Sequence, residues 1–561
     1  MKRVWWKEAV GYELYPKSFK DTNGDGIGDL KGITEKLPYL KSLGIDFVWI
    51  CPFYKSPMHD NGYDVADYYT VDRRFGTMED MDCLLETAKK LDIRIIIDMV
   101  LNHTSDQHAW FQEALRNPES KYRNYYIFRK SIDMPSNIRS CFGGSVWEEC
   151  EPGVWYYHTF DKTQPDLNWE NPELRSEIYD MLNYWLDKGI SGFRMDAITY
   201  IKKAASLKKI ESNEEDGLYD IANIGTNQPG IGEFLLEMRE KCIDGRDVMT
   251  VAEAPGVPYE ELESFIGEKG YFSMIFDFSY ADMDLAAGGN WYDQAEWNFG
   301  DLKKLLFRSQ ISVQKEGWGA VYLENHDQPR SLNKYFREKT ARPDQKELRF
   351  LQGTALATLL MSLRGTVFLY QGEELGMQNC PFDSIEEFDD LNTLDQYHRA
   401  VRAGFSEKEA MQIACNRSRD NSRTPYPWNN GKNGGFTEAE KPWLKINPDY
   451  SINNAEDQIK EKDSLLCYYQ KLIAFRKAEE FQDTLIYGEI LELPVEAEAV
   501  IAFKRTGENG EFVEVYINMD DKAAAIQTER QNLVIGNYKD LNYNKETRSL
   551  TLRPYEAVIV R

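Results

Sequence analysis

Four short segments of the chain each end an apolar, strand-like run with acidic or histidine residues. They read IIIDMVLNH (95–103), GFRMDAI (192–198), VMTVAEA (248–254) and VYLENHD (321–327). A strand that is buried on both faces has no use for a carboxylate at its end unless the carboxylate has a function. Because the four strand ends follow one another along the chain, we expect them to rim one pocket containing Asp98, His103, Arg194, Asp196, Glu253, His326 and Asp327.

Carboxylates gathered in one cleft have a chemical use that a single carboxylate lacks. They shift one another's pKa values, which gives a site one ionised nucleophile and one protonated acid near neutral pH. Taken alone, a strand-end aspartate is more often a helix cap or a surface ion pair. The four segments together favour a catalytic pocket.

Two of the carboxylates have neighbours that suit acid–base chemistry. Arg194 stands two residues before Asp196, on the same side of a strand, where it would orient the carboxylate and lower its pKa, as a nucleophile requires. Glu253 is flanked by apolar residues, and partial desolvation would raise its pKa, as suits a general acid/base. Two of only six histidines, His103 and His326, fall inside these motifs, which favours ligand binding over a purely structural role.

The elements that must position these residues alternate between strands and helices up to about residue 480. Candidate strands are 12–19, 46–52, 94–100, 192–197, 249–254, 273–278, 320–327 and 365–374, with helical patterns between them, for example 78–92 and 173–189. Eight β–α alternations predict an α/β fold, a (β/α)8 TIM barrel. That fold places catalytic residues at the C-terminal ends of its strands.

Two segments fall outside this alternation. Residues 104–171 are rich in Trp, Tyr, Gly and Pro and too long for an ordinary loop, so we expect an inserted small domain after the third strand. After about residue 480, short alternating runs separated by Asn, Gly and Asp predict a C-terminal antiparallel β domain. The expected organisation is a barrel of residues 1–103 and 172–480, an inserted domain of 104–171 and a C-terminal β-sandwich of 481–561.

Composition restricts the partners and the compartment. The 561 residues carry a formal net charge of −26, which disfavours nucleic acid and anionic membrane surfaces because both would be repelled. Every long apolar run is interrupted by charges, and the N-terminal residues lack the apolar core of a signal peptide. The eight cysteines are scattered without a CxxC pair, as expected of reduced thiols. We therefore expect a cytoplasmic protein that contacts no membrane.

The segment DTNGDGIGD (21–29) has the ligand pattern of a metal site. Oxygen donors at alternating positions, separated by glycines, suit a hard cation such as Ca²⁺. The twelfth position is Gly32 rather than Glu, and no helix pair is evident, so an EF-hand is not expected. The alternative is a solvated acidic turn. The candidate ligands are Asp21, Asn23, Asp25, the backbone carbonyl of Ile27, and Asp29.

The four strand-end segments resemble the signature regions of the α-amylase superfamily, glycoside hydrolase family 13, and the likeness extends along nearly the whole chain. QPDLNWEN (164–171), YQGEELGM (370–377) and RDNSRTPYPW (419–428) are most similar to the branch of oligo-1,6-glucosidases, dextran glucosidases and α-glucosidases. The resemblance implies that Asp196 is a nucleophile forming a covalent glycosyl-enzyme, Glu253 the acid/base, and Asp327 a stabiliser of the transition state. It also implies that the insert is domain B and that the loop at 21–29 holds a structural Ca²⁺.

The resemblance further implies a set of substrate-binding residues. His103 and His326 would hydrogen-bond the sugar ring, and Tyr63 would stack on its face. Asp60 would bind the far hydroxyls and pair with Arg419, closing the pocket so that single terminal glucose units are released. Asp98 would have a mainly structural role. Phe142, Phe160, Gln164 and Arg194 complete the implied site.

The implied function is that of a retaining, exo-acting α-glucosidase on short malto- or isomalto-oligosaccharides. Ala197 stands where related enzymes strict for α-1,6 bonds often have Val, and Ala254 is also small, which favours α-1,4 or mixed specificity. The alternatives are a strict oligo-1,6-glucosidase or dextran glucosidase, and a sucrose isomerase or glucosyltransferase that shares the covalent intermediate. Trehalose-6-phosphate hydrolases share the core motifs too, although no distinct phosphate-binding signature is evident.

A non-catalytic scaffold is disfavoured because all three carboxylates are present and no membrane span is evident. The sequence carries no indication of oligomeric state.

Overall fold

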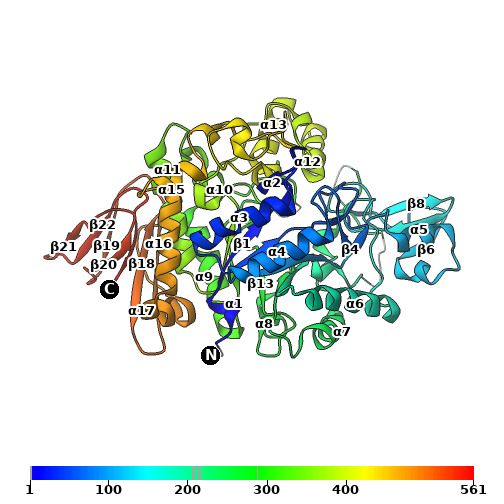
Figure 1. Cartoon of the computed structure of the whole chain (residues 1–561), viewed down its shortest axis with the longest axis horizontal. Coiled ribbons are helices and arrows are strands. Elements are labelled where there is room, and N and C mark those ends of the chain that lie inside the picture. The colour runs from blue at the N-terminus through cyan, green and yellow to red at the C-terminus, as the bar shows by residue number, and fades with distance from the viewer. Residues whose placement is uncertain (1–2, 205–208, 213–215, 287–288) are drawn as a thin grey trace.

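Eight parallel strands close into a barrel at the centre of the molecule (Figure 1). The structure is a computed structural model that describes residues 3–204, 209–212, 216–286 and 289–561. The barrel strands are β1 (Val10–Leu14), β2 (Phe47–Ile50), β5 (Arg94–Val100), β10 (Gly192–Asp196), β12 (Met249–Glu253), β13 (Met274–Phe276), β14 (Ala320–Val321) and β15 (Thr366–Tyr370). β15 pairs with β1, for example Val367 with Val10, and so closes the ring. The predicted TIM barrel and its eight strands are confirmed.

Most of the strands are shorter than predicted, and for two of them the reason is clear. The segment 12–19 leaves the sheet after Leu14 because Pro16 begins a short helix, α2 (Pro16–Phe19), in which the missing N–H of proline is no loss. The segment 320–327 keeps only Ala320 and Val321 in the sheet, since the following residues turn into the site. In both cases the apolar run of the sequence extends beyond the strand, into α2 in the first case and into the residues of the site in the second.

Helices surround the barrel, as each parallel crossover requires. α6 (Pro172–Lys188) shows why they form where they do: the Asn171 side chain caps its first turn, Pro172 opens it, and Gly189 ends it with φ +111°. The others are α3 (Leu30–Leu43), α4 (Met78–Lys90), α7 (Ile231–Met238), α8 (Leu262–Ile266), α9 (Phe299–Glu316), α11 (Lys346–Ser362) and α16 (Leu465–Lys477).

The segment between β5 and α6 projects from one side of the barrel (Figure 1). It holds α5 (Ala109–Arg116), β6 (Phe128–Lys130), β7 (Ile138–Arg139), β8 (Trp147–Glu151) and β9 (Val154–Tyr157), of which β6, β9 and β8 form an antiparallel sheet. β7 instead pairs in parallel with β11 (Tyr219–Asp220), which follows β10. The insert is therefore joined to the loop that follows β10.

The C-terminal strands form two packed antiparallel sheets. The first contains β16 (Glu489–Glu492), β17 (Val500–Thr506), β18 (Phe512–Asn518), β23 (Ala557–Val560) and β20 (Leu533–Gly536), and the second contains β19 (Ala524–Gln527), β22 (Ser549–Leu552) and β21 (Tyr543–Asn544). Val500 and Ala502 face the second sheet, whereas Ile501 and Phe503 join the core of the barrel. Alternate side chains of β17 thus pack against the barrel on one face of the sheet and against the second sheet on the other.

A long segment between β15 and α16, which we call the excursion, contributes side chains to the site. It carries α12 (Leu391–Arg402), α13 (Glu407–Arg417) and α14 (Asp420–Arg423), and it returns buried side chains to the barrel mouth. None of the helices in the described part of the chain combines the length and apolar character that spanning a bilayer requires.

Candidate active site

A cavity of about 310 Å³ opens at the C-terminal ends of the barrel strands. Asp196 at the end of β10, Glu253 at the end of β12 and Asp327 after β14 all line it. Six of the predicted substrate-binding residues line it too: Asp60, Tyr63, His103, Phe142, Phe160 and Arg419. The strand ends that the sequence predicted to share one pocket do share it.

The floor of the cavity is built around Arg194. Its Nη1 donates to Asp98 Oδ1 at 2.8 Å and to Asp196 Oδ1 at 2.6 Å, and its Nη2 donates to Glu253 Oε2 at 2.6 Å. The Ala197 backbone N–H also donates to Glu253 Oε2, at 3.0 Å. We call Asp98, Arg194, Asp196 and Glu253 the floor cluster. One guanidinium thus holds the predicted nucleophile and the predicted acid next to each other.

The charge balance of the floor cluster differs from the prediction for Asp196. Burial raises the pKa of the Asp196 carboxyl well above its usual value, although Arg194 acts in the opposite direction. Burial likewise raises the pKa of Asp98. The predicted lowering at Asp196 is therefore wrong in its net direction, because Arg194 is shared by three carboxylates and cannot offset the burial of all of them.

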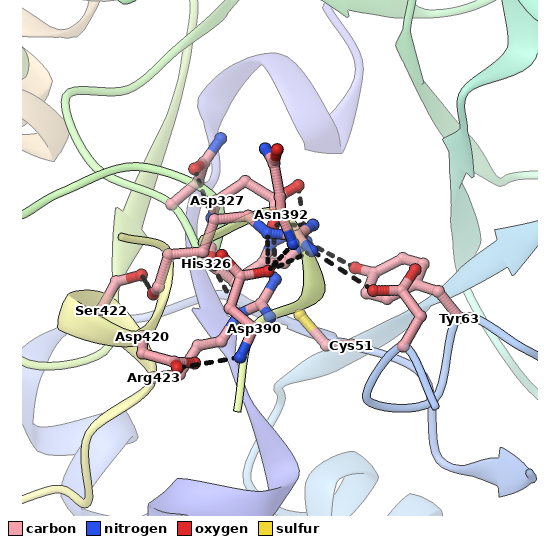
Figure 2. Close-up of polar contacts among 12 residues, drawn as sticks. Cys51, Tyr63, His326, Asp327, Asp390, Asn392, Asp420, Ser422 and Arg423 are labelled. Carbon is pink, nitrogen blue, oxygen red and sulfur yellow. Dashed lines mark hydrogen bonds and ion pairs between the residues drawn. The ribbon is translucent and has the colours of Figure 1, made fainter. Parts of the chain in front are cut away.

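The wall of the cavity is built around two arginines of the excursion. Arg423 Nη2 donates to Asp327 Oδ1 at 2.7 Å, and Arg419 Nη1 reaches the same oxygen at 3.3 Å. Arg419 also donates to Asp390 Oδ1, from Nε at 2.8 Å and Nη2 at 2.6 Å, and to Asp60 Oδ1 at 3.3 Å. We call Asp60, Asp327, Asp390, Arg419 and Arg423 the wall cluster. Figure 2 shows Asp327, Asp390 and Arg423 converging on the same space.

The wall cluster carries more compensating charge than the floor. Burial would raise the pKa of Asp327, but His326, Arg419 and Arg423 together hold it well below its usual range. Burial would raise the pKa of Asp390 as well, but Arg419 and Arg423 lower it below its usual value. Asp60 is the exception, because burial outweighs its arginine contacts and raises its pKa to about 6. Asp327 is therefore a permanent anion at neutral pH.

Aromatic and histidine side chains complete the pocket. Tyr63 and His326 stack with ring centroids 5.4 Å apart, and Tyr63 Oη lies 2.7 Å from His326 Nε2 (Figure 2). Burial lowers the pKa of His103 to about 4, so this ring is neutral. Gln164 Nε2 lies 3.1 Å from His103 Nε2 and donates to Asp60 Oδ2 at 3.0 Å. Gln164, Arg194 and His326 thus support the lining residues from behind.

Sequence reasoning missed several residues of the site. Asp390 was not singled out; it caps α12, and its buried carboxylate also holds Arg419. Arg423 had a usable signal, since it follows Arg419 by four residues and so faces the same way on a helix. The mouth of the cavity adds Tyr200, Phe278, Asp282, Gln328 and Asn392, none of which the sequence motifs marked.

A buried lysine joins the insert to the barrel beside the site. Lys203 Nζ lies 2.5 Å from Asp166 Oδ2 of the insert, 2.5 Å from Asn102 Oδ1 after β5, and 2.7 Å from the Tyr200 carbonyl. Asn102 also donates to Asp166, at 3.2 Å. The Lys203 ammonium group therefore supplies the positive charge between Asp166 of the insert and Asn102 of the barrel.

The loop at 21–29 is organised by its own carboxylates. Asp21 Oδ1 accepts the backbone N–H groups of Asn23 at 2.9 Å and Gly24 at 2.8 Å, and Asp29 Oδ1 accepts that of Gly32 at 2.7 Å. Asp21 and Asp29 are buried, whereas Asn23 and Asp25 face solvent. The predicted ligands therefore lie on one short turn, where their oxygens accept hydrogen bonds from the loop itself, and the Ca²⁺ site stays a prediction.

Comparisons with known proteins agree with this geometry. The family model "Alpha amylase, catalytic domain" matches residues 13–488. An oligo-1,6-glucosidase of Parageobacillus thermoglucosidasius is 40% identical over 572 residues, covering 100% of this chain and 99% of the relative. A glucan 1,6-alpha-glucosidase of Streptococcus pneumoniae is 40% identical, covering 95% and 94%. The solved isomaltulose synthase of Erwinia rhapontici NX5 is 39% identical, with a TM-score of 0.93 over 100% and 99% of the two chains.

Proposed function

The chain belongs to the α-amylase family of glycoside hydrolases, and we propose that it is a retaining, exo-acting α-glucosidase that releases glucose from short oligosaccharides. The observation that carries this proposal is the cavity of about 310 Å³ that is lined by all three carboxylates. Its volume lies at the small end of ligand pockets, which span about 300–1,000 Å³. The Asp60–Arg419 pair and Phe142, whose ring lies 4.9 Å from the Arg419 guanidinium, close its wall. One terminal glucose ring fits such a space.

The mechanism follows from the two clusters. Asp196 attacks the anomeric carbon while Glu253 protonates the leaving oxygen, which forms a glycosyl-enzyme and releases the aglycone. Glu253 then removes a proton from water, which attacks the same carbon and frees Asp196. Two displacements retain the anomeric configuration. Because Asp196 and Glu253 bond to one guanidinium, they are neighbours, as a retaining mechanism requires.

Asp327 and the wall cluster would act on the transition state. Positive charge develops on the sugar ring during both displacements, and a permanent anion beside it is stabilising. Arg419 and Arg423 fix the Asp327 carboxylate so that it need not reorient during the reaction.

The test is glucose release from maltose, isomaltose, sucrose and trehalose, measured in parallel with Asp196→Asn as the blank. Glucose of retained configuration from at least one substrate, absent in the blank, is the expected result. If no substrate yields glucose above the blank, the hydrolase proposal is wrong.

We propose that the enzyme accepts both α-1,6 and α-1,4 bonds. Relatives named for α-1,6 cleavage support the first, and the small Ala197 beside the nucleophile supports the second. A difference of one or two methyl groups alters discrimination by only about 1–3 kcal/mol. Isomaltose cleaved with maltose untouched would make the enzyme strict for α-1,6 bonds.

A sucrose isomerase is a second candidate, supported by solved isomaltulose and trehalulose synthases that cover the full chain at 37–39% identity. Such an enzyme would return the fructose of sucrose to the glycosyl-enzyme instead of releasing it. Product analysis at high sucrose concentration separates the two: isomeric disaccharides support an isomerase, and equal glucose and fructose support hydrolysis.

We propose a structural Ca²⁺ in the loop at 21–29, held by Asp21, Asn23, Asp25, Asp29 and the Ile27 carbonyl. The oxygen donor set supports it. Removal of the ion with a chelator should lower the melting temperature, and added Ca²⁺ should restore it. An Asp25→Asn variant, altered at an exposed candidate ligand, should need more Ca²⁺ for the same recovery.

We also propose a cytoplasmic location and neutral oligosaccharides as the substrates. All eight cysteines are free, which suits a reducing compartment. The net charge of −26 disfavours binding of nucleic acid or of an anionic membrane surface.

A further inference from the structure

A buried carboxylate lies behind His326 that the proposed mechanism does not use. Glu13, the fourth residue of β1, is only 1% exposed. Its Oε1 lies 2.5 Å from His326 Nδ1, and the same oxygen accepts the His326 backbone N–H at 3.3 Å and the Cys51 thiol at 3.6 Å. Burial raises the pKa of Glu13, and the facing His326 and Arg194 oppose that rise. Oε1 thus already accepts the His326 N–H and the Cys51 thiol, and with Glu13 ionised the short contact to Nδ1 is an N–H···O⁻ hydrogen bond.

Glu13, Cys51 and His326 are close enough to raise the question of a metal. Two ligand atoms of a tetrahedral zinc site stand about 3.3 Å apart, because each lies about 2.0–2.1 Å from the ion. The distance of 2.5 Å between Glu13 and His326 is instead that of a short hydrogen bond. The group is therefore a carboxylate–imidazole pair.

The other ring nitrogen faces the pocket. His326 Nε2 lies 2.7 Å from Tyr63 Oη and 3.4 Å from Asp327 Oδ2. Tyr63 has a single hydroxyl proton, and its Oη also lies 2.9 Å from Asp98 Oδ2, a carboxylate oxygen. Because the carboxylate can only accept, Tyr63 donates to Asp98, and Nε2 must donate to Tyr63. Both ring nitrogens then carry protons.

The surroundings of the ring favour that charge. The titratable and charged groups that face it are Glu13, Tyr15, Cys51, Tyr63, Asp98, Arg194, Asp327 and Arg423. Among them, three carboxylates stand against two guanidiniums. A doubly protonated ring balances the remaining negative charge.

We propose that Glu13 is a positioning residue whose carboxylate keeps the proton on His326 Nδ1. His326 then stays an imidazolium and presents Nε2–H to Tyr63, Asp327 and the sugar hydroxyl beside them. The proposal rests on the proposed function in one respect, namely that the ligand is a sugar. Its consequence is a third positive group beside Asp327, in addition to Arg419 and Arg423.

The direct test reads the ring itself. The full-length enzyme, labelled with ¹⁵N at histidine, should show His326 as an imidazolium at pH 8, with the signal assigned by its loss in His326→Gln. In Glu13→Gln the same ring should be neutral at pH 8, because an amide can accept the Nδ1 proton but cannot balance the charge. A neutral His326 in the unmodified enzyme at pH 8 overturns the proposal.

A matched control separates this effect from the loss of a buried charge. Glu374 is also fully buried, but it accepts the hydroxyls of Tyr12, Tyr39 and Tyr426 instead of a histidine N–H. Glu374→Gln should leave the His326 signal as it is. A neutral ring in this variant as well would assign the effect to general disturbance of the core and overturn the proposal.

Kinetics give the second readout. Between pH 6 and pH 8, kcat/KM of Glu13→Gln should fall at least about tenfold relative to the unmodified enzyme, since each pH unit above the pKa of an unsupported imidazole is a factor of ten in protonation. Glu374→Gln should keep the unmodified profile. An unchanged profile in Glu13→Gln overturns the proposal. Failure of the proposed function looks different, because the unmodified enzyme would then release no glucose while the ¹⁵N result stands.

Discussion

On the floor of the pocket one arginine faces three carboxylates, whereas on its wall two arginines face three. The pKa values follow this difference. Burial raises those of Asp98 and Asp196 on the floor, while Arg419 and Arg423 hold those of Asp327 and Asp390 low on the wall. The pKa values of these four carboxyls therefore shift in opposite directions, depending on how many guanidiniums their cluster contains.

This difference in pKa values agrees with the role that the proposed mechanism gives to each cluster. A cluster short of positive charge can hold and release a proton, as an acid/base pair must do. A cluster with ample positive charge keeps its anions fixed, which suits a group that stabilises a transition state without moving protons. In the proposed mechanism the floor cluster would carry the covalent step and the proton transfers, and the wall cluster would supply a constant field.

The largest expected effect comes from removing the nucleophile of the floor cluster. Asp196→Asn keeps the shape but cannot form the glycosyl-enzyme, so kcat should fall at least about 10⁴-fold, the scale of breaking a catalytic unit. The measurement is steady-state hydrolysis of an aryl α-glucoside, with a thermal melt as the folding control. A loss below about 100-fold would mean that another residue is the nucleophile.

The next effect is that of changing the single arginine of the floor. Arg194→Lys keeps the charge, but one ammonium cannot hold Asp98, Asp196 and Glu253 in a fixed fork, so kcat should fall about 10³-fold. The melting temperature should fall too, because buried carboxylates lose their partner. A kcat within tenfold of the unmodified enzyme would show that charge alone organises the floor.

The same substitution on the wall should cost much less. In Arg419→Lys, Asp327 keeps Arg423 at 2.7 Å, so kcat/KM should fall only about tenfold and mainly through KM. Measured side by side with Arg194→Lys, this variant tests the comparison directly. Equal losses in kcat for both variants would contradict the distinction between the two clusters.

An effect of about the same size concerns Asp60, the member of the wall cluster whose pKa burial raises. Its pKa of about 6 means that it loses its charge, and its pairing with Arg419, as the pH falls below 6. We expect kcat/KM to decline on the acid side near pH 6, and Asp60→Asn to lower activity about tenfold while removing this decline. Profiles of both enzymes from pH 4.5 to 8 are the measurement. An identical acid limb in the variant would assign that limb to another group.

The barrel and the floor cluster were predictable because both depend on local sequence. Buried parallel strands read as continuous apolar runs, and Asp196 and Glu253 are the residues that end them. The early end of β1 at Leu14 was not recognised, since the proline that begins α2 sits inside an otherwise strand-like run. The proposed role of Glu13, on β1, was missed because its partner His326 lies 313 residues away.

The wall cluster was only half predictable for the same reason. Asp390 and Arg423 come from an excursion between β15 and α16 whose path no local pattern reveals. Asp60 and Arg419 were found only through their likeness to known motifs, since each alone resembles an ordinary loop charge. The pairing of β7 with β11 was missed as well, because two-residue strands carry no periodic signal.

That pairing has a consequence for protein engineering. Ile138–Arg139 of the insert and Tyr219–Asp220 of the loop after β10 form one small parallel sheet, and Lys203 joins the same two segments through Asp166. In a chimera that exchanges residues 104–171 alone, β7 would come from one protein and its partner β11 from another. The insert should therefore be transferred together with the loop up to Asp220. Such a graft keeps the pairing of β7 with β11 and the contact of Lys203 with Asp166.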